Sequence, residues 1–89
     1  MTTIKAIEYH FPTNYITNDP NNKLTKKLGI STRYIAEQDE TASDLAIQAA
    51  EKLFAKGICQ KGEIDFLLFC TQAPDYILPT TACIIQEKL

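Results

Sequence analysis

Residues Glu63–Gln86 read EIDFLLFCTQAPDYILPTTACIIQ, and this stretch decides the fold. Within it, Asp65–Cys70 contains an unbroken apolar run, which is typical of a strand buried on both faces of a parallel sheet. A polar loop, Thr71–Pro79, comes next, and an apolar helical segment begins near Thr81. Because ligand sites in open α/β sheets lie beyond the carboxyl ends of the strands, we expect part of the function to lie near this loop.

The segment before this stretch, Asp39–Gly57, is the clearest predicted helix. Thr41 and Asp44 have the spacing of a capping box, and Gly57 can take the left-handed conformation that ends a helix. Apolar side chains recur at helical spacing and predict the buried face: Leu45, Ala46, Ala49, Ala50, Leu53 and Phe54. A helix therefore precedes the predicted strand.

The first part of the chain predicts three shorter elements. Ile4–Phe11 has the mixed alternation of a strand, which Pro12 ends. A short helix is expected after Asn18, Asp19 and Pro20, running through Lys27 and ending at Gly29, and Ile30–Ala36 is expected to be an extended loop or edge strand. The fold class is therefore α/β, in the order strand, short helix, edge segment, long helix, buried parallel strand, loop, helix.

This element list does not complete a domain. A strand that is apolar on both faces needs neighbours on both edges and helices on both sides, which two parallel strands cannot provide. The last predicted helix, Thr81–Leu89, has no glycine or cap at its end. We therefore expect residues 1–89 to be the N-terminal portion of one incomplete domain, which exposes apolar strand edges and self-associates.

Composition excludes several classes of function. With 45% hydrophobic and 22% charged residues, the 89-residue chain has the composition of a folded, cytoplasmic domain, and its longest apolar run is far too short to span a membrane. The net charge of −2 gives no reason to expect nucleic acid as a partner. The three cysteines form no C-x-x-C pair, which argues against a disulfide framework, a zinc site or a redox module.

Ordered motifs across nearly the whole chain resemble the N-terminal region of β-ketoacyl-acyl carrier protein synthase III, a family of the thiolase-like superfamily. The motifs are a first strand that ends at Pro12, ITND (Ile16–Asp19), GI (Gly29–Ile30) with Arg33 and Ile35–Ala36, DETASDLA (Asp39–Ala46), PDY (Pro74–Tyr76) and PTTAC (Pro79–Cys83). The resemblance implies a partial thiolase-like fold.

The resemblance also implies an activity, a decarboxylative Claisen condensation. In that family a cysteine thiolate takes an acyl group from acyl-CoA, and a histidine and an asparagine assist the decarboxylation of malonyl-acyl carrier protein. All three catalytic residues are expected beyond Leu89, so the 89-residue chain alone is expected to be inactive. No metal or resident cofactor is implied, because CoA and acyl carrier protein enter as thioester substrates. The resemblance leaves the acyl length and the pathway open, and a non-catalytic, acyl-carrier-binding or self-associating α/β module is the alternative.

The candidate site residues under this resemblance are Lys27, Arg33 and Leu78. Lys27 stands where the family has an arginine that contacts a phosphate of CoA, and Arg33 belongs to the same basic cluster. Lys23 stands where the family has a tryptophan that stacks on adenine, so another acyl carrier could replace CoA. Leu78 stands where a family residue reaches the acyl pocket of the partner subunit. For the lysines, the alternative is a solvated basic stretch without a ligand. For Leu78, the alternative is a leucine packed within its own loop.

Two further residues have a structural interpretation. Cys83 lies in the first turn of a predicted helix, where a thiol pKa can be lowered, but its neighbours are apolar and we expect it to pack inside. His10 is the only histidine and is expected to be a surface or hydrogen-bonded residue.

Overall fold

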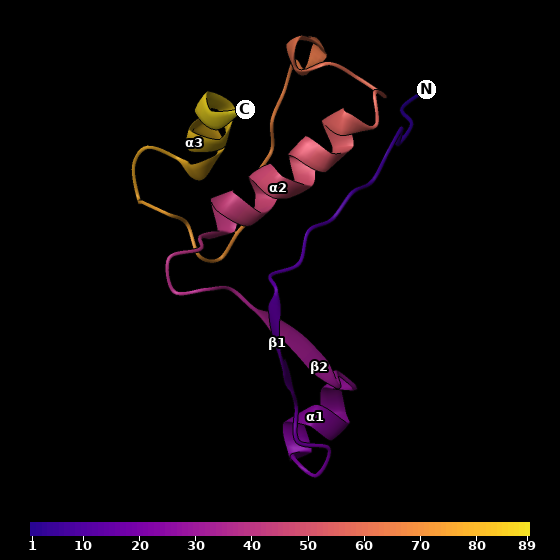
Figure 1. The fold of residues 1–89 in the computed structure, drawn as a ribbon, viewed down its shortest axis with the longest axis vertical. Helices are drawn as coiled ribbons and strands as arrows, with labels where there is room; N and C mark the ends of the chain where they lie inside the picture. The colour runs from indigo at the N-terminus through magenta and orange to yellow at the C-terminus, as the bar shows by residue number, and fades with distance from the viewer. The chain divides into compact units, whose positions relative to one another are not determined.

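The computed structural model describes residues 1–89, which divide into two units: Phe11–Glu40, and Met1–His10 together with Thr41–Leu89. Along the chain the elements are β1 (Asn14–Thr17), α1 (Lys23–Leu28), β2 (Thr32–Ile35), α2 (Ala42–Ala55), the short 3-10 helix η1 (Lys61–Glu63) and α3 (Thr81–Lys88) (Figure 1). None of the helices is both long and apolar enough to cross a membrane.

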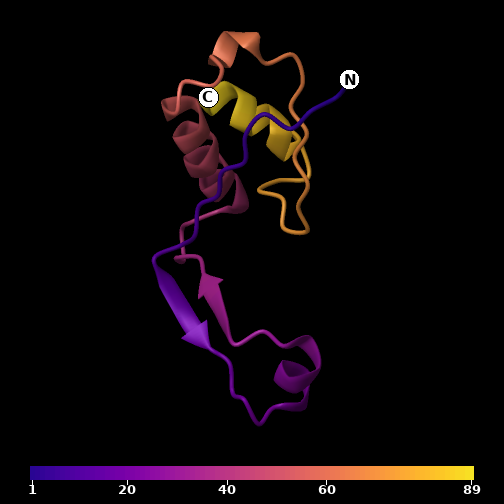
Figure 2. The same cartoon turned by 90° about the vertical axis from the view of Figure 1, so that its right-hand side faces the viewer.

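The Phe11–Glu40 unit is built on an antiparallel pair of strands. β1 and β2 pair with Tyr15 opposite Tyr34, and α1 lies in the connection between them (Figure 2). The ring of Tyr34 stacks on Phe11 with a centroid separation of 4.5 Å and meets Tyr15 edge-on at 6.0 Å. These aromatic contacts stabilise the pair. The extended or edge segment predicted at Ile30–Ala36 is confirmed as β2.

Both ends of α1 follow from local sequence signals. The side chain of Asn22 caps the first turn, with Oδ1 accepting from the backbone N–H of Leu24 at 2.8 Å. Gly29 ends the helix in the left-handed conformation, at φ 70°. The predicted end is therefore confirmed, whereas the helix begins at Lys23, after the cap residue Asn22, rather than at Pro20.

The capping box predicted for α2 is confirmed. The Thr41 hydroxyl accepts from the backbone N–H of Asp44 at 3.2 Å, and the Asp44 carboxylate accepts from the backbone N–H of Thr41 at 3.0 Å. Gly57 follows the helix with φ 73°. All six residues of the predicted apolar face are at least partly covered, and the polar residues Gln48, Glu51, Lys52 and Lys56 are exposed.

The capping box makes the stability of the chain depend on pH. The backbone N–H of Thr41, which donates to the Asp44 carboxylate, is the main cause that lowers the pKa of Asp44. A carboxyl whose folded pKa is lowered stabilises the fold above its ordinary pKa of about 3.9, and this contribution is lost as the pH falls through the folded pKa. We therefore expect the difference in Tm between the wild type and Asp44→Asn, measured by circular dichroism, to be largest at pH 6 and to shrink below about pH 4. A difference that stays constant to pH 2.5 would contradict this role for the carboxylate.

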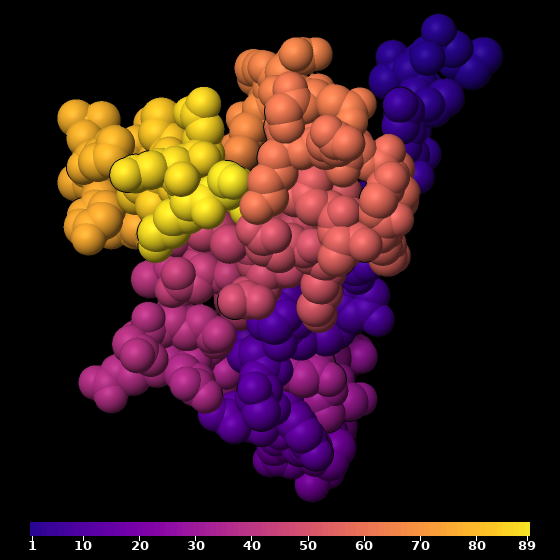
Figure 3. Space-filling model, turned by 45° about the horizontal axis from the view of Figure 1, so that its top comes forward, coloured from indigo at the N-terminus to yellow at the C-terminus, as the bar shows by residue number.

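The second unit packs α3 beside α2 (Figures 1 and 2). Ile85, on α3, is 3% exposed and is the only buried apolar side chain of the chain. The N-terminal segment of the same unit is joined to α2 by an ion pair of 2.8 Å between Lys56 Nζ and Glu8 Oε2, and Lys52 Nζ donates to Tyr9 O at 3.4 Å. The Lys56 ammonium and the backbone N–H of Tyr9 lower the pKa of Glu8. The first residues of the segment stand clear of the rest of the unit (Figure 3).

Two of the predicted strands are wrong for this chain. Ile4–Phe11 and Asp65–Cys70 form no strand, and the one sheet is antiparallel rather than parallel. The Asp65–Cys70 segment is not buried on both faces either, because Phe66 is 81% and Leu68 85% exposed, whereas Leu67 and Phe69 are partly covered. The physical reason is that a strand needs a neighbouring strand along its length, and the one sheet contains β1 and β2 alone.

Candidate functional site

The loop between the 64–70 segment and α3 presents three consecutive large apolar side chains that are exposed. Tyr76 is 64%, Ile77 93% and Leu78 79% exposed, and the Leu78–Pro79 peptide bond is cis. Leu78 is therefore not packed within its own loop, so the alternative interpretation of this residue is wrong for this chain. The loop ends at Thr80, whose carbonyl accepts from the backbone N–H of Cys83 as α3 begins.

A hydrogen-bonded cluster joins this loop to the first turn of α2. The hydroxyl of Ser43, which is completely buried, donates to Asp75 Oδ2 at 2.5 Å. Ser43 Oγ also lies 2.9 Å from Thr41 Oγ1, the hydroxyl of the capping box. The second carboxylate oxygen, Asp75 Oδ1, is buried and has no hydrogen-bond partner within the chain. The cluster therefore connects residues that are 32 positions apart in the sequence.

A separate pocket in the Phe11–Glu40 unit is lined by one basic residue, Arg33. This pocket of about 440 Å³ is lined by α1 itself and by the segments that precede and follow it in the sequence. Arg33, one of the lining residues, donates from Nε to Asn18 Oδ1 at 3.2 Å. Asn18 in turn donates to the backbone carbonyl of Ile30 at 2.9 Å. The structure thus places Arg33 at this pocket, whereas Lys23 and Lys27 are exposed on α1 and do not line it.

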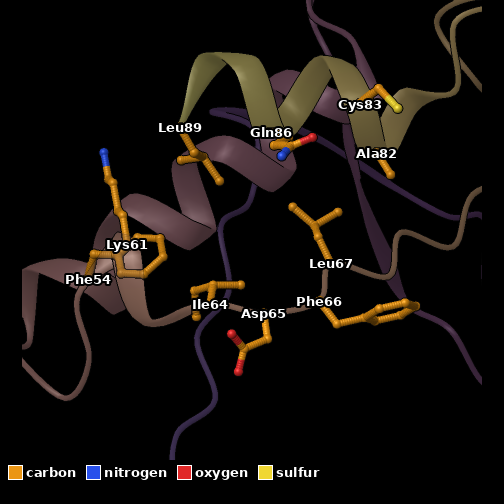
Figure 4. A pocket seen from close by; sticks show the side chains of 10 residues that line it. All are labelled: Phe54, Lys61, Ile64, Asp65, Phe66, Leu67, Ala82, Cys83, Gln86 and Leu89. Carbon is orange, nitrogen blue, oxygen red and sulfur yellow. The ribbon is translucent and has the colours of Figure 1, made fainter.

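A second, mainly apolar pocket lies between α2, α3 and the 64–70 segment, with a volume of about 410 Å³ (Figure 4). Leu67 points toward α3, near Ala82 and Gln86, whereas Asp65 points away from it (Figure 4). Lys61 closes one end, with its ammonium 5.8 Å from the ring centroid of Phe54 and 2.8 Å from Glu51 Oε1. This pocket offers apolar surface but no pair of groups arranged for acid–base chemistry.

All three cysteines are free thiols. The prediction that Cys83 packs inside is wrong for this chain, because Cys83 is exposed at the edge of the apolar pocket and accepts a hydrogen bond from the Thr80 hydroxyl at 3.2 Å. Cys70 is exposed and Cys59 is partly covered. The one hydrogen bond to a thiol is the bond that Cys83 accepts from Thr80, so none of the three cysteines is hydrogen-bonded to His10 in the manner of a catalytic cysteine–histidine pair.

Histidine and carboxylate side chains offer no metal site, since no group of three or more His, Cys, Asp or Glu residues could hold an ion. His10 is partly covered, and its Nδ1 is buried without a hydrogen-bond partner. The structure instead brings together the side chains of Thr41, Ser43 and Asp75. The sequence predicted only the role of Thr41, as a cap of its own helix. A capping motif and a PDY loop are visible in the sequence, but the hydrogen bond between them is not.

Comparisons with known proteins converge on one family, although no family model matches the chain. The chain is similar to the β-ketoacyl-[acyl-carrier-protein] synthase III of Streptococcus mutans, with 35% identity over 94 residues, and to that of Neisseria meningitidis, with 35% identity over 88 residues. These matches cover 97% and 90% of this chain but only 29% and 28% of the two relatives. The chain also superimposes on a crystal structure of 3-oxoacyl-(acyl-carrier-protein) synthase III with a TM-score of 0.83 and 46% identity, over 97% of this chain and 28% of the other.

Proposed function

Because the chain corresponds to the N-terminal segment of β-ketoacyl-[acyl-carrier-protein] synthase III and has a partial thiolase-like α/β fold, we propose that it is part of a condensing acyltransferase. The observation that carries this proposal is the TM-score of 0.83 at 46% identity over 97% of the chain. The chain spans less than a third of the length of the relatives it matches, so the activity belongs to a longer, full-length protein.

The proposed reaction is a decarboxylative Claisen condensation. A cysteine thiolate attacks the carbonyl carbon of an acyl thioester, and the CoA thiolate leaves. Malonyl-acyl carrier protein then loses CO₂, and the resulting carbanion attacks the acyl-enzyme to form a carbon–carbon bond and free the cysteine thiolate. The nucleophile and the histidine and asparagine that assist it lie beyond Leu89, and residues 1–89 contribute binding surfaces rather than catalytic groups. The proposed setting is the cytoplasm, with acyl carrier protein and acyl-CoA as partners.

The acyl donor is proposed to contact the basic face of α1. Lys27 lies in the last turn of α1 and is exposed, and Arg33 lines the pocket beside this helix, so both are accessible to a phosphate. Lys23, at the start of α1, offers an ammonium rather than an aromatic ring, which leaves an acyl carrier other than CoA as the second candidate donor.

We expect Lys27→Ala in the full-length protein to raise KM for acyl-CoA about three- to tenfold and to leave kcat unchanged, because an exposed ammonium contributes to ground-state binding of a phosphate. Lys26→Ala is the matched control, since Lys26 is the adjacent exposed lysine in the same turn. A KM that Lys27→Ala leaves at the wild-type value would rule out the phosphate contact.

The loop residue Leu78 is proposed to reach the acyl pocket of a partner subunit in a homodimer. Its exposure of 79% and its place among exposed apolar neighbours support an intermolecular role. The same exposure favours the alternative function, a non-catalytic module that binds an acyl carrier or self-associates through this loop.

Incubation of the full-length protein with acyl-CoA and malonyl-acyl carrier protein carrying a labelled carboxyl group tests the proposed function. We expect labelled CO₂ and 3-oxoacyl-acyl carrier protein to form in equal amounts, and residues 1–89 alone to form neither. If the full-length protein binds acyl carrier protein but releases no CO₂, the non-catalytic alternative is correct.

A further inference from the structure

The buried hydroxyl of Ser43 donates a hydrogen bond to a residue outside its own helix, α2. Ser43 is the second residue of the helix, and a helical serine usually faces solvent or bonds to the backbone of its own helix. Here the side chain is completely buried and donates to a carboxylate 32 residues away. A hydrogen bond from a hydroxyl to a carboxylate is stronger than one between two neutral groups, because the acceptor is charged.

The direction of the hydrogen bonds in this cluster follows from counting protons. A serine hydroxyl has a single proton, and that of Ser43 goes to Asp75, so Thr41 must be the donor in its 2.9 Å contact with Ser43 Oγ. Thr41 Oγ1 itself accepts from the backbone N–H of Asp44. The hydrogen bonds therefore run from the first turn of α2, where negative charge is favoured, to the carboxylate of Asp75.

Nothing else holds the middle of the loop by a side-chain hydrogen bond. Between Gln72 and Pro79, the bond from Ser43 to Asp75 is the only one that joins a side chain of the loop to another element; the one other, from Ala73 N–H to Thr71 Oγ1, is internal. The three residues that follow Asp75 directly are the exposed apolar side chains, Tyr76, Ile77 and Leu78. The position of these side chains therefore depends on the Asp75 contact.

We propose that Ser43 and Asp75 are positioning residues that hold the 71–80 loop against the start of α2 and so set how far Leu78 extends into the acyl pocket of the partner subunit. This inference rests on the proposed function for the role of Leu78, whereas the hydrogen bond itself does not. The pair acts on acyl-chain preference through Leu78 and touches no substrate.

The test uses four variants of the full-length protein. Asp75→Ala and Ser43→Ala break the pair, and Asp75→Asn is the conservative variant, because the amide oxygen of asparagine still accepts from Ser43. Asp39→Asn is the matched control, since Asp39 is an exposed carboxyl that precedes the same helix in the sequence.

The first readout is limited cleavage by chymotrypsin after Tyr76, followed by mass spectrometry. Loss of the only side-chain hydrogen bond between the loop and α2 should raise the cleavage rate about tenfold in Asp75→Ala and Ser43→Ala, but not in Asp75→Asn or Asp39→Asn. An unchanged rate in Asp75→Ala overturns the proposal, whatever the activity of the enzyme.

The second readout is the ratio of kcat/KM for a long and a short acyl thioester, which a merely structural role would not move. We expect this ratio to change at least threefold in Asp75→Ala and to return to the wild-type value in Asp75→Asn. If Leu78→Phe changes the ratio but Asp75→Ala does not, the positioning role is wrong while the proposed function stands. If the full-length protein forms no condensation product, the proposed function fails and the specificity role fails with it. The cleavage data then test the hydrogen bond alone.

Discussion

Ile85→Ala is expected to lower the free energy of unfolding of the chain by about 2–4 kcal/mol, the range for truncating a buried isoleucine to alanine. Ile85 is the only buried apolar side chain, and it lies on α3, which packs beside α2. Because no other apolar side chain is buried to this extent, the effect should be large for a chain of 89 residues. Urea denaturation followed by circular dichroism at 222 nm measures it.

The matched control for this substitution is Ile77→Ala, which removes the same atoms from a side chain that is 93% exposed. It should change the free energy of unfolding by less than about 0.5 kcal/mol. Equal effects of the two substitutions would contradict the packing of α3 on α2.

Leu78→Phe in the full-length protein is expected to shift acyl preference toward shorter chains, changing the long-to-short ratio of kcat/KM about tenfold. The reason is that a larger side chain at the end of an apolar pocket removes room for terminal methylene groups, and one methylene group changes discrimination by about 1–3 kcal/mol. The measurement is a competition assay with two acyl thioesters of different length.

Ile77→Phe serves as the control for Leu78→Phe, because Ile77 is the adjacent apolar residue of the same loop and is also exposed. If the acyl preference changes with Ile77→Phe and not with Leu78→Phe, then Ile77 makes the pocket contact and the assignment to Leu78 is wrong. If neither substitution changes the preference, the loop does not reach the acyl pocket.

Local sequence signals predicted the helices well. The capping box of Thr41 and Asp44, and the left-handed glycines Gly29 and Gly57, are decided by residues within one turn of each other. Such signals need no information from the rest of the chain, and the structure places each of them as predicted. The apolar face of α2 is confirmed for the same reason, since helical periodicity alone defines it.

The strands could not be predicted in this way. Apolar content predicted Asp65–Cys70 as a buried strand, but a strand forms only where a neighbour pairs with its backbone, and residues 1–89 provide none. The exposure of Phe66 and Leu68, and of Cys83 on α3, has the same origin, because burial requires a second layer of structure.

The candidate site was predicted only in part. The sequence pointed to the loop and to Leu78, and the exposure of this leucine is consistent with an intermolecular role. The contact between Ser43 and Asp75 was missed, because a hydrogen bond between residues 32 positions apart depends on the packing of the loop against α2 rather than on any local pattern. Lys27 was grouped with Arg33 by charge, but only Arg33 lines the pocket beside α1.

The central proposal is that residues 1–89 form the binding part of a condensing enzyme whose nucleophile lies elsewhere in the full-length protein. Peptide mass spectrometry after incubation of that protein with acyl-CoA tests this claim most directly, because it locates the acyl-enzyme. We predict an acyl group on a cysteine beyond Leu89, with Cys59, Cys70 and Cys83 unmodified. Acylation of Cys83, or of no cysteine at all, would contradict the account.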